Sequence, residues 1–288
     1  MTLDDATAQF EAHRRYLRGL AYRMLGSVAE AEDVVQDAFL RWTAADRERV
    51  AEPRAFLSRI VTRLALDRLK SARAQREQYV GTWLPEPVVD GHDPIETIAL
   101  ADDLSVALLV ALERLSPLER AAFLLHDVFD MEFEQVADVL DRSEAAVRQL
   151  AARAREHVRQ GRARYDGSAD AARIADAFAT AMVSGDVDAL AKLLAADAVF
   201  YSDGGGKRAA ALNPIYGRDK IVRFIIGVTR KRGGIPDAST VERATINRLP
   251  GFVLHSPDGV ETLALEVAGE HIVAIYAVRN PDKLRHLS

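Results

Sequence analysis

The chain of 288 residues contains no cysteine. This absence excludes disulfides, thiolate nucleophiles and zinc sites with cysteine ligands, and it fits a reducing compartment. The sequence also lacks an apolar run long enough to cross a membrane, and its amino terminus has no apolar signal-peptide core. We therefore expect a cytoplasmic protein with no membrane partner. Its length allows two or three domains that each bury a core.

The chain also has no excess of positive charge. The formal net charge is −5, with 38 Lys and Arg against 43 Asp and Glu. This balance argues against a protein that coats nucleic acid indiscriminately. Any DNA binding must come from local basic faces on a mildly acidic whole.

Residues 133–155, FEQVADVLDRSEAAVRQLAARAR, predict two short amphipathic helices joined by a tight turn. Ser143 is a suitable N-cap for the second helix, which carries Arg148, Arg153 and Arg155. Such a pair can place its second helix in the DNA major groove. Any hairpin of two helices shows the same pattern, so this motif alone does not separate DNA binding from a structural hairpin.

The first 76 residues divide their charges by sign. They predict helices with a break at Gly26-Ser27. Residues 30–37 are acidic, whereas residues 54–76 hold seven basic residues and only one carboxylate, Asp67. Two solvated surfaces would explain this, but the segregation favours two different partners, one of them a polyanion.

Residues 77–102 contain no lysine or arginine, and Pro85, Pro87 and Pro94 forbid a long helix. An apolar peptide, WLPEP, interrupts this acidic linker at residues 83–87. Because a tryptophan rarely stays in water, we expect Trp83 to dock on another domain. Helix resumes at residues 104–115, and Ser116-Pro117 predicts the start of the next helix.

Together these motifs resemble the extracytoplasmic-function sigma factors of bacterial RNA polymerase, in the form that has only the sigma-two and sigma-four domains. The matching segments are GS at 26–27, AEDVVQDAF at 31–39, AFL at 55–57, LDRL at 66–69, LSPLER at 115–120 and the helix-turn-helix. The chain departs from the common pattern at Arg63, where many members have asparagine, and at Ala145, where glycine is frequent. These departures leave the promoter preference open.

The resemblance implies two partners, the RNA polymerase core (β′ clamp helices and β subunit) and promoter DNA. The residues that match the polymerase-binding surface are Glu32, Asp33, Gln36 and Asp37. The element that contacts the −10 region, helped by a base pocket at residues 43–50, offers Arg54, Arg59, Arg63, Arg68 and Lys70. The recognition helix for the −35 element offers Arg142, Ser143, Glu144, Arg148, Gln149 and, for phosphate, Arg153. A solvated structural role stays open for each of these residues.

The last third predicts an α+β domain. Two helices within residues 169–190 precede a strand at 198–203, a third helix at 217–226 and alternating runs at 244–249, 251–256, 260–267 and 271–278. This order, with GDVD at 185–188 and YGR at 216–218, resembles the SnoaL-like domains, in which a curved antiparallel sheet surrounds a conical pocket. We thus predict two all-α sigma domains at 8–76 and 103–162, a linker at 77–102 and an α+β cone at 168–288.

One subgroup of these sigma factors carries such a domain together with three motifs that are present here. The residues are Trp83, Leu84, Pro85, Glu86 and Pro87; Asp203, Gly204, Gly205, Gly206 and Lys207; and Asn280, Pro281, Asp282, Lys283 and Leu284. The resemblance implies that the C-terminal domain modulates the sigma module in cis. We predict that WLPEP packs against this domain near residues 203–207 or 280–284 and braces the two sigma domains.

An enzyme is the alternative. Residues that could line the cone are Tyr201, Asp203, Tyr216, His255 and His271. Nothing in the sequence couples a nucleophile to a base, so we expect no catalysis, no cofactor and no metal. An isomerase, a cyclase or a ligand sensor fused to a DNA-binding regulator stays open, as does an unidentified small-molecule ligand in the cone.

Overall fold

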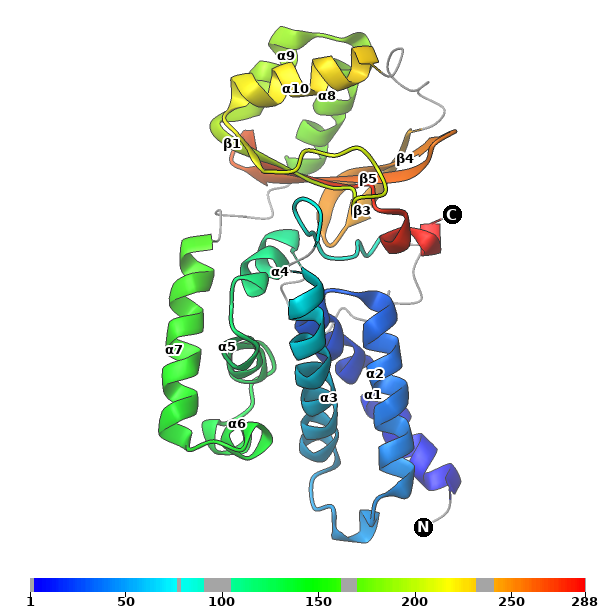
Figure 1. The fold of residues 1–288 in the computed structure, drawn as a ribbon, viewed down its shortest axis with the longest axis vertical. Coiled ribbons are helices and arrows are strands. Elements are labelled where there is room, and N and C mark those ends of the chain that lie inside the picture. The colour runs from blue at the N-terminus through cyan, green and yellow to red at the C-terminus, as the bar shows by residue number, and fades with distance from the viewer. Residues whose placement is uncertain (1–2, 77–78, 91–104, 162–169, 232–240, 288) are drawn as a thin grey trace. The chain divides into compact units, whose positions relative to one another are not determined.

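The computed structural model describes residues 3–76, 79–90, 105–161, 170–231 and 241–287, and the chain divides into two compact units. The first unit holds the helices up to Arg76 and the segment from Leu108 to Gly161. The second holds linker residues 79–90 and the chain from Asp170 onward (Figure 1). The remainder of the predicted linker, including Pro94, lies outside the described residues. Across the described ranges no helix is long and apolar enough to span a membrane.

The first unit begins with a bundle of α1 (Leu3–Leu25), α2 (Val28–Ala44) and α3 (Pro53–Arg76). The predicted break is confirmed: Gly26 has a φ of 69°, and the Ser27 hydroxyl accepts a hydrogen bond from the Glu30 amide at 3.3 Å. Trp42 is fully buried and donates its indole N–H to the Ala6 carbonyl at 2.9 Å, which anchors the end of α2 to α1. A short 3-10 turn, η1 (Arg47–Arg49), leads into α3.

The rest of this unit is also helical. Its elements are α4 (Val106–Glu113), of which the part from Leu108 belongs to this unit, α5 (Pro117–Phe123), the π-helical turn η3 (Leu124–Val128), α6 (Phe133–Leu140) and α7 (Glu144–Gly161). Ser116 caps α5, as the Ser-Pro pair predicts, and it forms a reciprocal capping box with Glu119. Asp141 ends α6 in the left-handed conformation, and the Ser143 hydroxyl caps α7 by accepting from the Ala146 amide at 3.3 Å. The sequence predicts this helix-turn-helix correctly.

The second unit is built on one sheet. Its strands are β1 (Leu194–Asp203), β2 (Ile215–Tyr216), β3 (Val241–Ile246), β4 (Leu249–Ser256), β5 (Gly259–Ala268) and β6 (His271–Val278), in the order β2-β1-β6-β5-β4-β3. The expectation of a wholly antiparallel sheet was wrong, because β1 pairs with β6 in parallel. A parallel pair needs a long crossover, and the chain from residue 204 to 270 supplies it.

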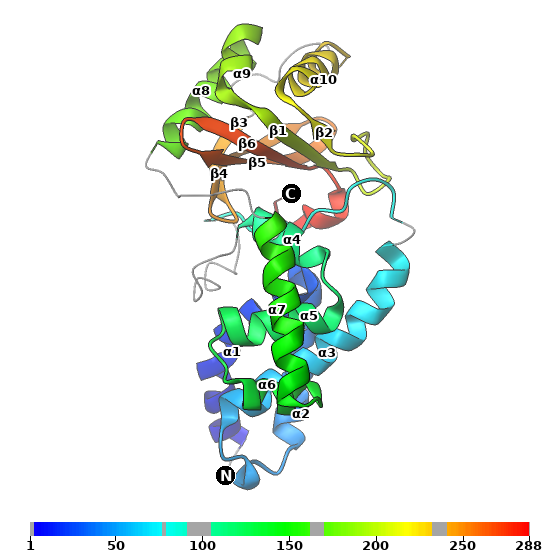
Figure 2. The ribbon, with the colours of Figure 1, turned by 90° about the vertical axis from the view of Figure 1, so that its left-hand side faces the viewer.

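Three helices, α8 (Ala171–Ser184), α9 (Val187–Leu193) and α10 (Arg218–Lys231), cover one face of this sheet (Figures 1 and 2). Alternation along β1 sends Ala198 and Phe200 toward the helices and sends Tyr201 and Asp203 to the opposite face. Linker residues 79–90 and the turns η5 (Pro281–Lys283) and η6 (Arg285–Leu287) lie on that opposite face.

Candidate polymerase, promoter and regulatory surfaces

The carboxylates of α2 lie on its outward side. Asp33 and Gln36 are exposed and Glu32 and Asp37 are half-buried, whereas the residues between them pack into the bundle. Arg68 of α3 donates to Asp33 and to Asp37, each at 3.3 Å, and a second arginine, on α1, pairs with Glu32. These ion pairs fix the carboxylates on the bundle surface. The Asp33 side chain is still 66 % exposed, so the surface can meet a cationic partner.

The five predicted DNA contacts of α3 do not share one environment. Arg59, Arg63 and Lys70 are exposed, on the side away from the buried stripe that includes Leu57, Val61 and Ala65. Arg68 is half-buried and faces the carboxylates of α2, and Arg54, although exposed, donates to the loop before α6. The sequence could not distinguish the two groups, since the partners of Arg68 and Arg54 are 31 to 75 residues away along the chain.

The loop between η3 and α6 packs against α1 and α3. The Arg54 guanidinium lies 4.3 Å from the centre of the Tyr16 ring and donates to the Phe129 carbonyl at 3.4 Å. The Tyr16 and Phe129 rings meet edge to face with centroids 4.9 Å apart. Arg120 of α5 is 2 % exposed and donates to the Met24 carbonyl at 2.7 Å, next to its ion pair with Glu113. Sequence reasoning missed this junction.

Helix α7, the predicted recognition helix, presents an exposed polar start. The exposed residues here are Arg142, Ser143, Glu144, Ala145, Arg148 and Gln149. Arg148 pairs with Glu144 one turn before it and lies 4.3 Å from the centre of the Phe133 ring. Both partners orient the guanidinium without burying it, so it stays available to a base edge.

Arg153 lies further along α7, where it pairs with Glu119 of α5 at 3.2 Å. Burial disfavours the charged form of Glu119, but hydrogen bonds from Ser116 and the charge of Arg153 outweigh burial and lower its pKa. Arg153 therefore has a structural partner in addition to its predicted phosphate contact.

Asp203, at the end of β1, is the centre of the contact between the linker and the C-terminal domain. Its side chain is fully buried and accepts hydrogen bonds from the Tyr79 hydroxyl at 2.5 Å, the Leu84 amide at 2.9 Å and the Lys283 ammonium at 2.7 Å. Lys283 also donates to the Leu84 carbonyl and lies 4.1 Å from the centre of the Trp83 ring. We call these five residues, Tyr79, Trp83, Leu84, Asp203 and Lys283, the linker clamp.

The linker clamp confirms that WLPEP packs on the C-terminal domain beside both other motifs. Sequence reasoning missed Tyr79, which lies at the polar start of the linker and belongs to none of the three motifs. Burial and the hydrogen bond to the Asp203 carboxylate raise the pKa of Tyr79 far above its ordinary value, so the hydroxyl stays a donor. Further along the linker, the backbone is hydrogen-bonded to the β3–β4 hairpin. The Asn247 amide donates to the Val88 carbonyl, and the Asp90 amide donates to the Thr245 carbonyl.

The glycines of the 203–207 loop allow close approach. Gly205 has a φ of 59°, and a Cβ placed on it would lie 2.2 Å from the Asn280 amide nitrogen. A Cβ on Gly206 would lie 3.2 Å from Val80 of the linker. The space beside this loop is thus occupied by the chain itself, and Lys207 pairs with Asp282.

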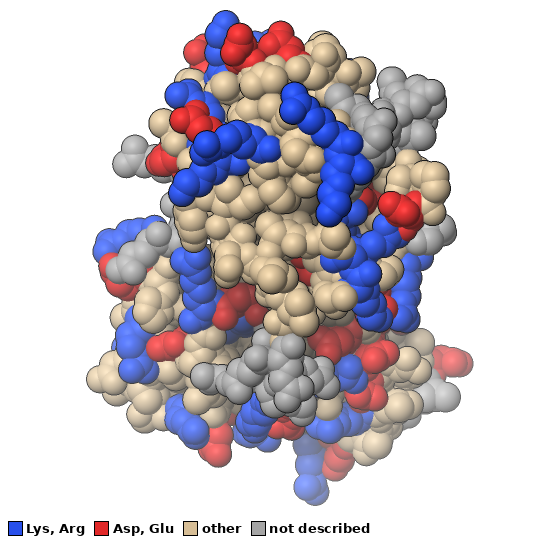
Figure 3. Space-filling view, turned by 45° about the horizontal axis from the view of Figure 1, so that its top comes forward, with Lys and Arg blue, Asp and Glu red and all other residues tan. Residues whose placement is uncertain are grey.

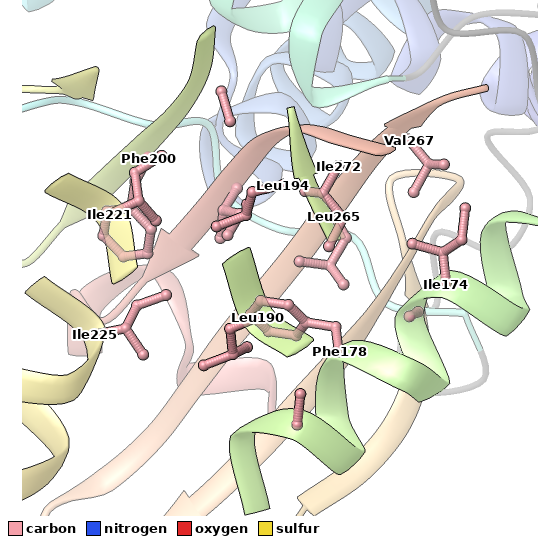
Figure 4. Packing of buried hydrophobic residues seen from close by; sticks show 14 of the residues in the cluster. Ile174, Phe178, Leu190, Leu194, Phe200, Ile221, Ile225, Leu265, Val267 and Ile272 are labelled. Carbon is pink, nitrogen blue, oxygen red and sulfur yellow. The ribbon is translucent and has the colours of Figure 1, made fainter. Parts of the chain in front are cut away.

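The interior between helices and sheet is filled with apolar side chains, among them Phe178, Leu190, Phe200, Ile221 and Leu265 (Figure 4). The candidate cone residues do not converge there. Tyr201 points to the face away from the helices, where it stacks on Tyr276 of β6 with centroids 5.3 Å apart, and Asp203 belongs to the linker clamp. The other three, Tyr216, His255 and His271, are exposed.

One buried acid on the sheet was not foreseen. Glu266 of β5 is fully buried and accepts a hydrogen bond from the Tyr276 hydroxyl at 2.6 Å. Burial raises the pKa of Glu266, although this hydrogen bond opposes the shift. In the part of the chain that the structure describes, no cluster of three acidic or histidine residues could hold a metal ion.

Comparison with known proteins agrees with this arrangement. The Sigma-70 region 2 family matches residues 9–75, and the Sigma-70 region 4 family matches residues 105–158. The chain is similar to ECF RNA polymerase sigma factor SigJ of Mycobacterium tuberculosis, with 42 % identity over 96 % of this chain and 92 % of SigJ. It is also 37 % identical to the probable ECF sigma factor SigI of that species, over 66 % of this chain and 67 % of SigI.

The crystal structure of M. tuberculosis SigJ superposes with a TM-score of 0.82, covering 97 % of this chain and 98 % of SigJ at 39 % identity. The match extends through the α+β domain and is not confined to the sigma helices. The chain therefore belongs to the extracytoplasmic-function sigma factors, which direct RNA polymerase to promoters and initiate transcription.

Proposed function

We propose that the outward side of α2 binds the β′ clamp helices of the polymerase core. Asp33 and Gln36 are exposed, and Glu32 and Asp37 flank them at helical spacing. Carboxylates that meet arginines across an interface give orientation and fast association. In this proposal Arg68 holds Asp33 and Asp37 in position and does not contact DNA, because its guanidinium bonds to both carboxylates.

Promoter DNA is contacted by two elements. The exposed cations of α3, Arg59, Arg63 and Lys70, supply phosphate contacts beside the −10 element. The exposed start of α7 contacts the −35 element, with Arg148 suited to guanine and Gln149 to adenine. Two elements about 25 base pairs apart are separated by about 85 Å along B-DNA. The Tyr16–Phe129 contact must therefore open before both elements can be bound.

The C-terminal domain regulates this opening through the linker clamp. The observation that carries the proposal is the buried Asp203 carboxylate, which binds Tyr79, Leu84 and Lys283 together. Residues 79–90 belong to the only covalent connection between the two sigma regions. Fixing that connection on the C-terminal domain limits how the two regions can separate. Because the domain is tethered, even a weak contact is populated at effective concentrations of about millimolar.

Two changes test the regulatory role in run-off transcription with purified core polymerase. Truncation after about Tyr165 removes the C-terminal domain, and Trp83→Ala removes the ring that covers Lys283. Both variants should still join the core, and both should change promoter-dependent output. Output that stays equal to that of the full chain in both variants would remove the regulatory proposal and leave the sigma assignment intact.

A further inference from the structure

Helix α10 carries a charge that its neighbours do not share. It holds five basic residues and one carboxylate, Asp219, whereas α8 and α9 each hold one basic and one acidic residue. The basic residues of α10 are Arg218, Lys220, Arg223, Arg230 and Lys231. On the side of this unit that carries the three helices, Lys and Arg gather in two groups that flank an uncharged surface (Figure 3).

Most of these cations lie in one outward stripe. Lys220, Arg223, Arg230 and Lys231 are exposed and follow helical spacing, while Ile221, Val222 and Ile225 are buried on the inner side. The stripe extends over about 16 Å. Within the described residues, none of its four cations forms an ion pair with a carboxylate; the Arg223 Nε donates to the Asp219 carbonyl at 3.2 Å.

The middle of the stripe is a glycine that internal packing does not require. Gly227 is exposed, and a Cβ placed on it would meet no heavy atom within 4 Å. Glycine inside a helix costs about 1 kcal/mol relative to alanine. A bare backbone flanked by cations allows a polyanion to approach closely at this point.

We propose that α10 binds the phosphate backbone of duplex DNA through Lys220, Arg223, Gly227, Arg230 and Lys231, without reading base sequence. An anionic membrane also attracts cations, but an interfacial helix needs exposed large apolar side chains. Among the described residues, the exposed large apolar side chains lie elsewhere than on α10. The proposal adds a DNA contact to those of the sigma regions and does not depend on the linker clamp.

The first test measures how the affinity of the holoenzyme for DNA depends on salt. Arg223→Gln combined with Arg230→Gln should lower the slope of log K against log[KCl] by about 2, equally on a promoter duplex and on a scrambled duplex. Arg173→Gln combined with Lys192→Gln makes the same charge change on α8 and α9 and should leave the slope unchanged. An unchanged slope in the α10 variant overturns the proposal. So does an α10 variant that binds DNA normally but no longer binds vesicles of phosphatidylglycerol.

The second test uses the absence of native cysteine in the chain. Gly227→Cys, labelled with an iron chelate before assembly with the core, should cut promoter DNA in a short window on both strands. Asp188→Cys on α9 is the matched control and should cut weakly or not at all. Gly227→Gln should leave thermal stability equal or higher while weakening DNA binding. DNA that stays intact beside the Gly227→Cys label overturns the proposal.

Discussion

Lys283 donates to Asp203 at 2.7 Å in a setting where the two side chains are 12 % and 0 % exposed. The same ammonium lies over the Trp83 ring, so one cation joins the linker, the end of β1 and the turn η5. Removing the cation would leave a buried carboxylate without its opposite charge.

Lys283→Met should therefore lower the free energy of unfolding of the second unit by about 3 kcal/mol. The matched control is Lys207→Met, which breaks the Lys207–Asp282 pair, whose side chains are 55 % and 41 % exposed. That control should lose less than about 1 kcal/mol. Urea unfolding of the full chain distinguishes the two variants. Equal losses of unfolding free energy would mean that the buried Lys283–Asp203 pair stabilises the chain no more than the exposed Lys207–Asp282 pair does.

Gly205→Ala should destabilise the second unit more than Gly269→Ala. Both glycines have almost the same φ, 59° and 58°. In each variant, therefore, alanine in the left-handed conformation costs about 1 kcal/mol of stability. Only at Gly205 does the new Cβ collide with Asn280, which brings the loss to about 3 kcal/mol. Thermal denaturation measures the difference. Similar losses for the two variants would show that Asn280 can move aside freely.

Glu266 should lower the stability of the folded chain as pH rises above the ordinary pKa of a glutamate, opposite in sign to Glu119 and Asp282, whose pKa values are lowered. Its pKa is raised by burial, so the unfolded chain loses this proton at a lower pH than the folded chain does. The contribution is complete below the unfolded pKa and is lost as pH rises toward the folded pKa. Glu266→Gln keeps an oxygen that can accept from Tyr276 and should remove this contribution, so the variant gains stability relative to the unaltered chain as pH rises above about 4.

The comparison is the melting temperature of Glu266→Gln minus that of the unaltered chain, followed across that range. The difference should grow in favour of the glutamine variant as pH rises. A difference that is constant with pH would show that Glu266 ionises alike in the folded and unfolded chains.

Asp33→Lys should weaken binding to the polymerase core about tenfold or more, because it places a like charge against a basic partner. Stability should change by less than about 1 kcal/mol, since the pair with Arg68 is largely exposed. Glu11→Lys makes the same charge change on α1, at an exposed pair with Arg14. Fluorescence anisotropy with labelled chain measures both. Equal affinities would place the polymerase contact elsewhere.

Local signals predicted most of the elements. Ser27, Ser116 and Ser143 all cap helices where the sequence places them, because a cap depends on residues three positions apart. Alternation located β4, β5 and β6 within two residues. It missed the two-residue strand β2, and it could not show the direction of β1 relative to β6, since a crossover of that length leaves no local pattern.

The sites divide in the same way. The three motifs around Asp203 identified the linker clamp, yet Tyr79 was overlooked because a single tyrosine in a polar stretch has no period to mark it. The pairing of Arg68 with Asp33 and Asp37 depends on how α2 and α3 pack, which charge patterning alone does not reveal. The Tyr16–Phe129 contact joins segments more than a hundred residues apart and carries no sequence signature.

Run-off transcription with Lys283→Met tests the central claim most directly, with Lys207→Met beside it as the exposed control. If the linker clamp governs the sigma regions, Lys283→Met should bind the core normally while its promoter-dependent output changes about fivefold or more, as expected for coupling between sites. Lys207→Met should match the unaltered chain. Normal output from Lys283→Met at saturating holoenzyme would contradict regulation through the clamp.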